Sequence, residues 1–257
     1  MGTKGASGSS RSRLLALSLA LVVSSGAAAC NQAAKERAAA LAGSRVVRFE
    51  STDGVQLSGR VFGSGKVGVV LSHMLPADQS SWYEFAGTLA EKGYLVLTYD
   101  FRGYCPGGDA GCSKGTKDVA AIWQDTLGAI SFIRSQGADR VMLVGASMGG
   151  TSSLVAAAQA GSEVSAVVTL SAPQSIEGLV ADASVLTKVT AAKLFLAGDS
   201  DPSGAASAAQ ALYDQSPPPK SVQFLTTSDH GTDLLNGNQS EIVRTDILNE
   251  LAIYSGA

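Results

Sequence analysis

A serine stands inside a glycine-rich turn near the middle of the chain. Residues 145–149 read GASMG, so Ser147 has a glycine two positions away on each side. An apolar run over 141–144 precedes the turn, and a helix-like segment over 151–160 follows it. A serine on a tight turn between a strand and a helix can project its hydroxyl as a nucleophile. The alternative is a glycine-rich turn with no chemistry, but the strand and helix around it favour the nucleophile.

A serine hydroxyl needs a base to accept its proton. The chain has only two histidines, His73 and His230. His230 lies in the segment SDHGTDLL, after the last predicted strand, where its loop opens on the same edge of a sheet as the turn at Ser147. We therefore predict His230 as the base, against the alternative that it is a surface loop residue.

The base in turn needs a carboxylate that orients its ring and stabilises the imidazolium. The segment LFLAGDSDP places Asp199 and Asp201 after another predicted strand. Asp201 lies farther into the loop and precedes Pro202, so we choose it over Asp199 as the acid. Either aspartate could instead serve only to form the turn.

Strands and helices must alternate along the chain to bring these loops together. Strands are predicted over 46–51, 55–62, 67–72, 94–99, 140–144, 164–170, 192–197 and 221–226, and helices over 81–92, 117–136, 148–160, 176–189, 205–215 and 241–254. Several strands are apolar on both faces, as buried parallel strands are. We expect a mostly parallel central sheet with helices on both faces and an N-terminal β-hairpin. Ligands bind beyond the carboxyl ends of such strands. The loops of interest therefore begin at His73, Asp100, Ser147, Ser171, Gly198 and Ser228.

The order Ser147, Asp201, His230 resembles the order found in the α/β-hydrolase superfamily. The resemblance covers roughly residues 46–255 and rests on VVLSHMLPADQSSW, GYLVLTYDFRGYC, VMLVGASMGG, LFLAGDSDP and SDHGTDLL. It implies the α/β-hydrolase fold. Because the stretch from Ser171 to Lys193 is short, the protein is most similar to serine esterases without a large lid, of the dienelactone-hydrolase kind.

The resemblance also implies an oxyanion hole made of two backbone amides. By position these belong to Met148, directly after the nucleophile, and to a residue near Met74 or Leu75 in the loop after the third strand, of which we choose Leu75. Many relatives carry His-Gly where this chain has His73-Met74. A backbone donor survives such a replacement if the loop keeps its shape.

The first residues have the order of an export signal. Residues 1–13 are polar and basic, 14–23 are apolar, and 24–29 are small. Cys30 follows three alanines, which resembles the lipid-attachment site of bacterial lipoproteins. We expect an export signal over 1–29, a polar tether over 30–44 and a hydrolase domain over 45–257. The protein would be lipid-anchored in the cell envelope through Cys30, or alternatively secreted in soluble form.

The remaining cysteines, Cys105 and Cys112, flank a short Pro/Gly-rich loop. An exported protein meets an oxidising compartment, so we predict a disulfide between them. With two histidines and no C-x-x-C spacing, no metal site is expected. The net charge is −3 and no basic stripe is present, which argues against a nucleic-acid partner.

These features together predict a serine hydrolase, most simply a carboxylic-ester hydrolase that forms an acyl-enzyme on a small acyl substrate and needs no cofactor. A peptidase, thioesterase or acyltransferase could use the same residues. A non-catalytic envelope protein that binds a ligand on this scaffold is the alternative from another class. The oligomeric state is left open by the sequence.

Overall fold

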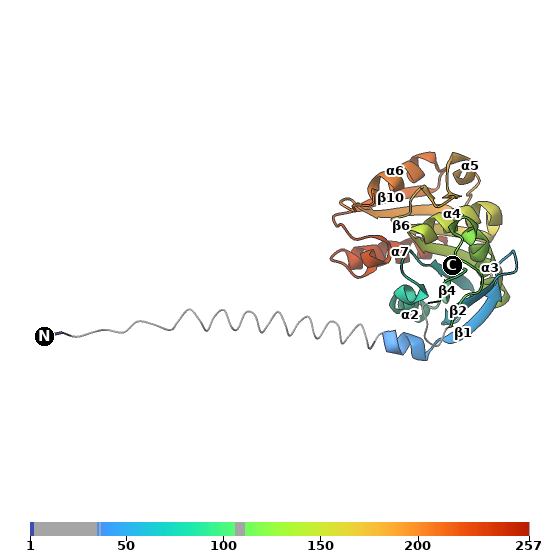
Figure 1. Ribbon diagram of the computed structural model, residues 1–257, viewed down its shortest axis with the longest axis horizontal. Coiled ribbons are helices and arrows are strands. Elements are labelled where there is room, and N and C mark those ends of the chain that lie inside the picture. The colour runs from blue at the N-terminus through green and yellow to red at the C-terminus, as the bar shows by residue number, and fades with distance from the viewer. Residues whose placement is uncertain (3–34, 36, 106–110, 257) are drawn as a thin grey trace.

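The central feature of the computed structural model, which describes residues 1–2, 35, 37–105 and 111–256, is a sheet of eight strands. The strand order is β1-β2-β4-β3-β5-β6-β9-β10. The strands are β1 (Arg45–Glu50), β2 (Gln56–Phe62), β3 (Val67–Ser72), β4 (Leu95–Asp100), β5 (Arg140–Ala146), β6 (Val164–Leu170), β9 (Ala192–Gly198) and β10 (Lys220–Leu225). Only the pairs β1–β2 and β2–β4 are antiparallel, and the other pairs are parallel. The expected N-terminal hairpin and mostly parallel sheet are confirmed, and Figure 1 shows β1 and β2 at one edge with β10 at the other.

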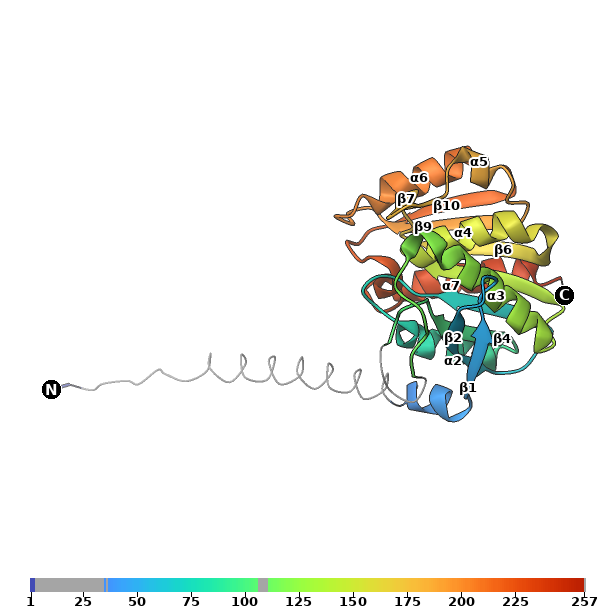
Figure 2. The same cartoon turned by 45° about the vertical axis from the view of Figure 1, so that its right-hand side comes forward.

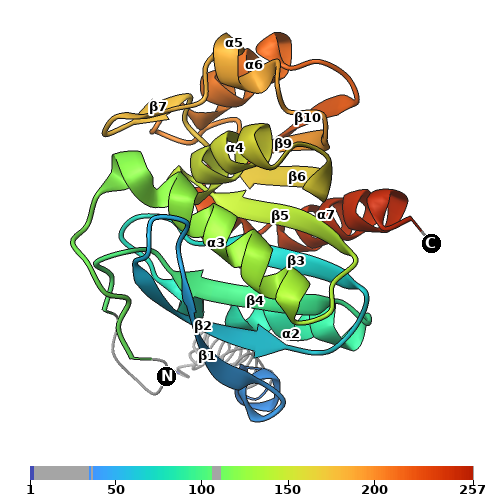
Figure 3. The same ribbon diagram turned by 90° about the vertical axis from the view of Figure 1, so that its right-hand side faces the viewer.

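Helices cover both faces of the sheet. The longer ones are α2 (Tyr83–Glu91), α3 (Ile122–Ser135), α4 (Met148–Ala160), α6 (Ala205–Gln215) and α7 (Ser240–Tyr254). Helices α3, α4 and α6 pack on one face and α2 and α7 on the other, as Figures 2 and 3 show. Each face has its own apolar core, and strands such as β4 are buried along their whole length. Burial on both faces explains why these strands read as continuous apolar runs in the sequence.

The prediction of a helix over 176–189 is wrong. The segment forms a small hairpin of β7 (Ser175–Ile176) and β8 (Leu179–Val180), followed by the short helix α5 (Ala183–Leu186). Glu177 and Gly178 both have positive φ, 46° and 87°. Two central residues with positive φ make the tight turn that suits the twist of a hairpin. No large lid domain is inserted here.

Most of the N-terminal region lies outside the described residues. This holds for Cys30 and for all of the expected export signal except residues 1–2. Residues 37–42, within the predicted tether, are helical, and Arg37 donates a hydrogen bond to the carbonyl of Ser80. Among the residues that the structure describes, no helix is both long and apolar enough to cross a membrane.

Candidate active site

Ser147 occupies a strained turn between β5 and α4. Its φ and ψ are 48° and −120°, a conformation that non-glycine residues rarely adopt and that the surrounding structure must hold in place. The Ser147 amide donates to the carbonyl of Leu170, at the end of the neighbouring strand, at 2.8 Å. The side chain lies at the carboxyl edge of the sheet and the residue is 7% exposed. The predicted turn geometry is therefore present.

Two glycines make this turn possible. A Cβ atom on Gly145 would lie 2.3 Å from the carbonyl oxygen of Gly149, and one on Gly149 would lie 2.4 Å from that of Ser72. Such distances are too short for any side chain, so glycine is required at both positions. Because Gly149 touches the backbone at the end of β3, the turn also lies directly against the loop that begins at His73.

His230 and Asp201 come together from two different loops. His230 precedes the short 3-10 helix η4 (Gly231–Leu235), and Asp201 follows β9. The His230 Nδ1 atom lies 2.7 Å from Asp201 Oδ2. The carboxylate is nearly inaccessible, with a side chain 1% exposed, whereas the imidazole is 30% exposed. Asp199 instead accepts a hydrogen bond from Ser200 and is exposed.

Ser203 completes the surroundings of the carboxylate. Its hydroxyl and its backbone amide both donate to Asp201 Oδ1, at 2.7 and 2.9 Å. The same hydroxyl lies 3.2 Å from His230 Nδ1. Burial raises the pKa of Asp201, but the hydrogen bonds from Ser203 and His230 outweigh burial and the net pKa is lowered. Asp201 is consequently held as a carboxylate, the form that can accept the ring proton of His230.

Ser147 and His230 line one cavity of about 210 Å³. Ser171, Pro173, Ile176 and Ser203 are among its other lining residues. Since the charged carboxylate of Asp201 can only accept, the proton of the neutral imidazole sits on Nδ1, and Nε2 is left with its lone pair. An imidazole in that form can take a proton from a hydroxyl in the same cavity.

His73 is placed where it cannot act as a base for Ser147. Its Nε2 atom accepts a hydrogen bond from the Phe101 amide at 3.1 Å, and Nδ1 lies 2.9 Å from the Met74 carbonyl oxygen. Burial lowers the pKa of His73 to about 4. This histidine thus joins the ends of β3 and β4 as a neutral ring, and the role of His230 as the base stays a prediction.

The two predicted oxyanion donors flank the turn. Met148 is the first residue of α4, where a helix leaves its amide without a partner inside the helix. Leu75 lies in the loop after β3 and packs partly buried against the core. The contact of Gly149 with the carbonyls of Ser72 and His73 brings that loop beside Met148. A role for Leu75 stays a prediction.

The disulfide between Cys105 and Cys112 is formed, as predicted. It follows Tyr104, whose ring packs edge-on against His73 at 4.6 Å between centroids. The Tyr104 hydroxyl also donates to Met148 Sδ at 3.9 Å. Tyr104, the residue before the bridge, therefore contacts the side of the site that carries the turn.

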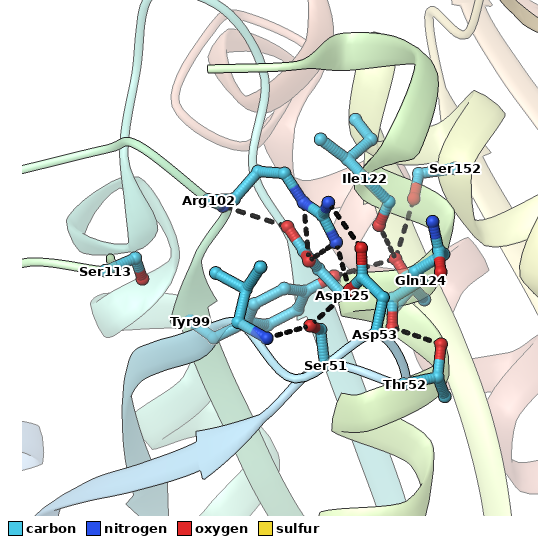
Figure 4. A network of polar contacts seen from close by, with 12 residues as sticks. Ser51, Thr52, Asp53, Tyr99, Arg102, Ser113, Ile122, Gln124, Asp125 and Ser152 are labelled. Carbon is cyan, nitrogen blue, oxygen red and sulfur yellow. Dashed lines mark hydrogen bonds and ion pairs between the residues drawn. The ribbon is translucent and has the colours of Figure 1, made fainter. Parts of the chain in front are cut away.

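A buried charge cluster fixes the loop after β4, as Figure 4 shows. Arg102 donates to Asp125 at 2.6 and 2.9 Å and to Asp53 at 2.7 and 2.8 Å. The hydrogen bonds from Arg102 lower the pKa of Asp53 to about 2, whereas burial raises the pKa of Asp125. The pKa values of the two carboxyl groups shift in opposite directions because the Asp125 side chain is 0% exposed and that of Asp53 is 32% exposed. The contacts of Arg102 all lie within this cluster and join the loop after β4 to Asp53 and Asp125, so its role is structural.

Sequence reasoning missed the roles of Ser171 and Ser203 in the walls of this site. Ser203 stands two residues after Asp201, a spacing at which a serine often bonds an aspartate in a turn, so a signal existed. Within the described part of the chain, no group of three or more His, Cys, Asp or Glu side chains could hold a metal ion.

Comparison with known families identifies the class of this fold. A family model described as the alpha/beta hydrolase fold matches residues 69–197, half of the chain, and the chain belongs to this family. The matched segment contains Ser147 and ends just before Asp201. No curated protein matches the chain.

Solved structures with the same fold are only distantly similar in sequence. An esterase from Pyrococcus furiosus is 16% identical, with a TM-score of 0.70 over 83% of this chain and 91% of that one. An esterase from Thermogutta terrifontis is 18% identical, with a TM-score of 0.64 over 82% and 99%. A bacterial membrane phospholipase A is 18% identical, with a TM-score of 0.67 over 96% of this chain and 100% of that one.

Proposed function

We propose that the protein is a serine hydrolase that cleaves carboxylic esters with short acyl chains. The observation that carries the proposal is the 2.7 Å pairing of His230 Nδ1 with Asp201, in a site where His230 and Ser147 border one cavity. The strained backbone of Ser147 supports it, because a serine in a rare conformation at a strand end is a feature of nucleophilic turns. Several solved structures with this fold are described as esterases.

The first half of the reaction forms an acyl-enzyme. Ser147 Oγ attacks the ester carbonyl carbon while His230 Nε2 takes the hydroxyl proton. The carbonyl oxygen becomes an oxyanion, held by the amides of Met148 and Leu75. Each such donor contributes about 3 kcal/mol to the stability of the transition state. When the tetrahedral intermediate collapses, the C–O bond breaks and the departing alcohol takes the proton from His230.

The second half releases the acid. A water molecule attacks the acyl carbon, and His230 Nε2 takes a proton from it. The bond to Ser147 Oγ breaks, and His230 returns that proton to the serine. Asp201 keeps the ring oriented and stabilises its positive charge in both halves without taking the proton itself.

The test is the hydrolysis of 4-nitrophenyl esters of increasing acyl length, together with a phospholipid substrate. The purified protein should hydrolyse acetate to butyrate esters, and the rate should fall for long chains because the cavity is small. Ser147→Ala should keep the thermal transition of the wild type and lose turnover. Equal rates in the two proteins would contradict the proposal, and a preference for the phospholipid would contradict the short-acyl part.

A peptidase, thioesterase or acyltransferase could use the same three residues, so matched amide and thioester substrates belong in the series. The remaining alternative is an envelope protein that binds a ligand without turnover. It would be favoured if no substrate in the series were hydrolysed and no fluorophosphonate adduct formed.

We also propose that the chain is exported and attached to lipid at Cys30. The basic, apolar and small-residue segments that precede Cys30 support this. The intact mass of the mature protein purified from membranes tests it. A mass that corresponds to a diacylated Cys30 at the N-terminus is expected, and an unmodified N-terminus in the soluble fraction would favour secretion.

A further inference from the structure

Ser171 has an unusual place beside the proposed nucleophile. It directly follows β6, and the Ser147 amide bonds the carbonyl of the residue before it. Its own amide donates to the Leu196 carbonyl at 2.8 Å, so it lies between the loops that carry Ser147 and Asp201. Its φ is 54°, one of three positive values among non-glycine residues of the described chain.

The hydroxyl of Ser171 has no hydrogen-bond partner among the described residues, although the residue is only 1% exposed. Other buried serines are satisfied: Ser72, Ser113, Ser152 and Ser153 each have a hydrogen-bond partner within the fold. A buried polar group without a partner destabilises the folded protein unless a ligand supplies the missing hydrogen bond. Ser171 lines the cavity that Ser147 and His230 border, so a rotation about its Cα–Cβ bond would bring the buried hydroxyl to a bound ligand.

The strand order indicates which part of a substrate would reach Ser171. The proposed oxyanion donor Leu75 follows β3, on one side of β5, and Ser171 follows β6, on the other side. A carbonyl oxygen directed toward Leu75 leaves the other substituents of the carbonyl carbon near Ser171. The alcohol must take its proton from His230, whose side chain is partly exposed, so it departs toward solvent. The acyl chain is the part that remains in the cavity.

The walls of the cavity fit a small acyl group that carries a polar substituent. Pro173, Ile176, Ala205 and Ala208 contribute apolar surface, and Ser171 contributes a hydroxyl that can donate and accept. The volume of about 210 Å³ lies below the range of roughly 300–1,000 Å³ that is usual for drug-sized ligands.

We infer that the Ser171 hydroxyl hydrogen-bonds an oxygen substituent of the acyl chain, so that the preferred substrates are esters of short hydroxy or keto acids. This inference rests on the proposed esterase function and names its substrate class. A site with a buried hydrogen-bonding group discriminates strongly against an analogue that leaves the group unpaired. Ser171 is thus a specificity residue, separate from the groups that handle the proton.

The experiment compares two esters with nearly equal volumes. These are 4-nitrophenyl 3-hydroxybutyrate, with each enantiomer tested separately, and 4-nitrophenyl 3-methylbutyrate, in which a methyl group replaces the hydroxyl. The measured quantity is the ratio of their kcat/KM values in wild type, Ser171→Ala and Ser171→Gly. The glycine variant removes the hydroxyl and also suits the positive φ, so a folded variant is available if alanine is strained.

We expect the wild type to prefer one enantiomer of the hydroxy ester, and both variants to lose roughly tenfold in the ratio. Ser175→Ala is the matched control, because Ser175 also lines the cavity but is exposed, and its ratio should not change. If both esters are hydrolysed and the ratio is the same in all proteins, the inference about Ser171 is overturned and the esterase proposal stands. If the wild type hydrolyses neither ester and forms no fluorophosphonate adduct, the esterase proposal falls and this inference falls with it.

Discussion

His230 Nδ1 and Asp201 Oδ2 lie 2.7 Å apart although the two residues belong to different loops, after β10 and after β9. The pair is possible because β9 and β10 are parallel neighbours, so both loops leave the sheet at the same edge. The hydrogen bonds that Ser203 gives to Asp201 fix the carboxylate and leave its other oxygen for His230. The pairing sets which ring nitrogen of His230 is free to act as a base.

The two neighbouring aspartates should therefore differ sharply in their importance. Asp201→Asn should lower kcat by roughly 10³- to 10⁴-fold, because an amide can hold His230 in the wrong tautomer. Asp199→Asn, in an exposed position, should change kcat little. Steady-state kinetics on 4-nitrophenyl butyrate measures both, and a larger loss in the Asp199 variant would reverse the assignment.

Gly149, two residues after Ser147, should not tolerate a methyl group. Gly149→Ala places a Cβ atom 2.4 Å from the Ser72 carbonyl oxygen, so the turn must move. We expect a loss of about 1–3 kcal/mol in the free energy of unfolding and of roughly 10²-fold in kcat/KM. Gly43→Ala is the control, since its Cβ would meet nothing closer than 3.9 Å. Wild-type kinetics in the Gly149 variant would show that the turn is not tight.

Much of the fold and of the candidate site could be predicted from the sequence, because loops that follow parallel strands leave the sheet at the same edge. Apolar runs reveal buried parallel strands, and residues that follow such strands meet at one edge. This rule is the basis on which Ser147, Asp201 and His230 are predicted to act together. The helix predicted over 176–189 failed because a two-residue turn at Glu177 and Gly178 overrode the apolar spacing.

Ser171 could not have been assigned a role from the sequence. A serine after a strand is ordinary, and nothing in its neighbours reveals a positive φ. Whether its hydroxyl finds a partner depends on segments far away in the chain. Only the packed structure shows that the hydroxyl is buried, unsatisfied among the described residues and beside the cavity.

His73 should make the protein sensitive to mild acid. The unfolded chain takes up a proton at this residue below about pH 6.5, but burial lowers the pKa of the folded state to about 4. Stability is therefore lost as pH falls between these values, by about 2 kcal/mol at pH 5. Burial raises the pKa of Asp100 to about 6, and this shift has the opposite effect, because it adds stability as the pH falls.

The comparison of wild type with His73→Gln isolates the histidine, because both proteins retain Asp100. Urea unfolding at pH 7.5 and pH 5.0 should show a smaller acid loss in the variant, by about 2 kcal/mol. Equal losses in the two proteins would mean that His73 does not remain neutral when folded.

The buried charge cluster should depend on its arginine. Arg102→Met leaves the carboxylate of Asp125 buried without its cation and should cost about 3–5 kcal/mol in the free energy of unfolding. Arg134→Met is the control, because Arg134 pairs with Glu163 at 3.6 Å on an exposed surface and should contribute less than about 1 kcal/mol. Chemical denaturation measures both, and similar small losses would contradict a structural role for the cluster.

The proposed reaction requires that Ser147 is a nucleophile activated by His230. The direct test is to treat the protein with a fluorophosphonate, digest it and locate the adduct by mass spectrometry. We expect one adduct, on the peptide that contains Ser147, and much slower labelling of His230→Ala. An adduct on another serine, or ester hydrolysis with Ser147 unlabelled, would contradict the proposed reaction.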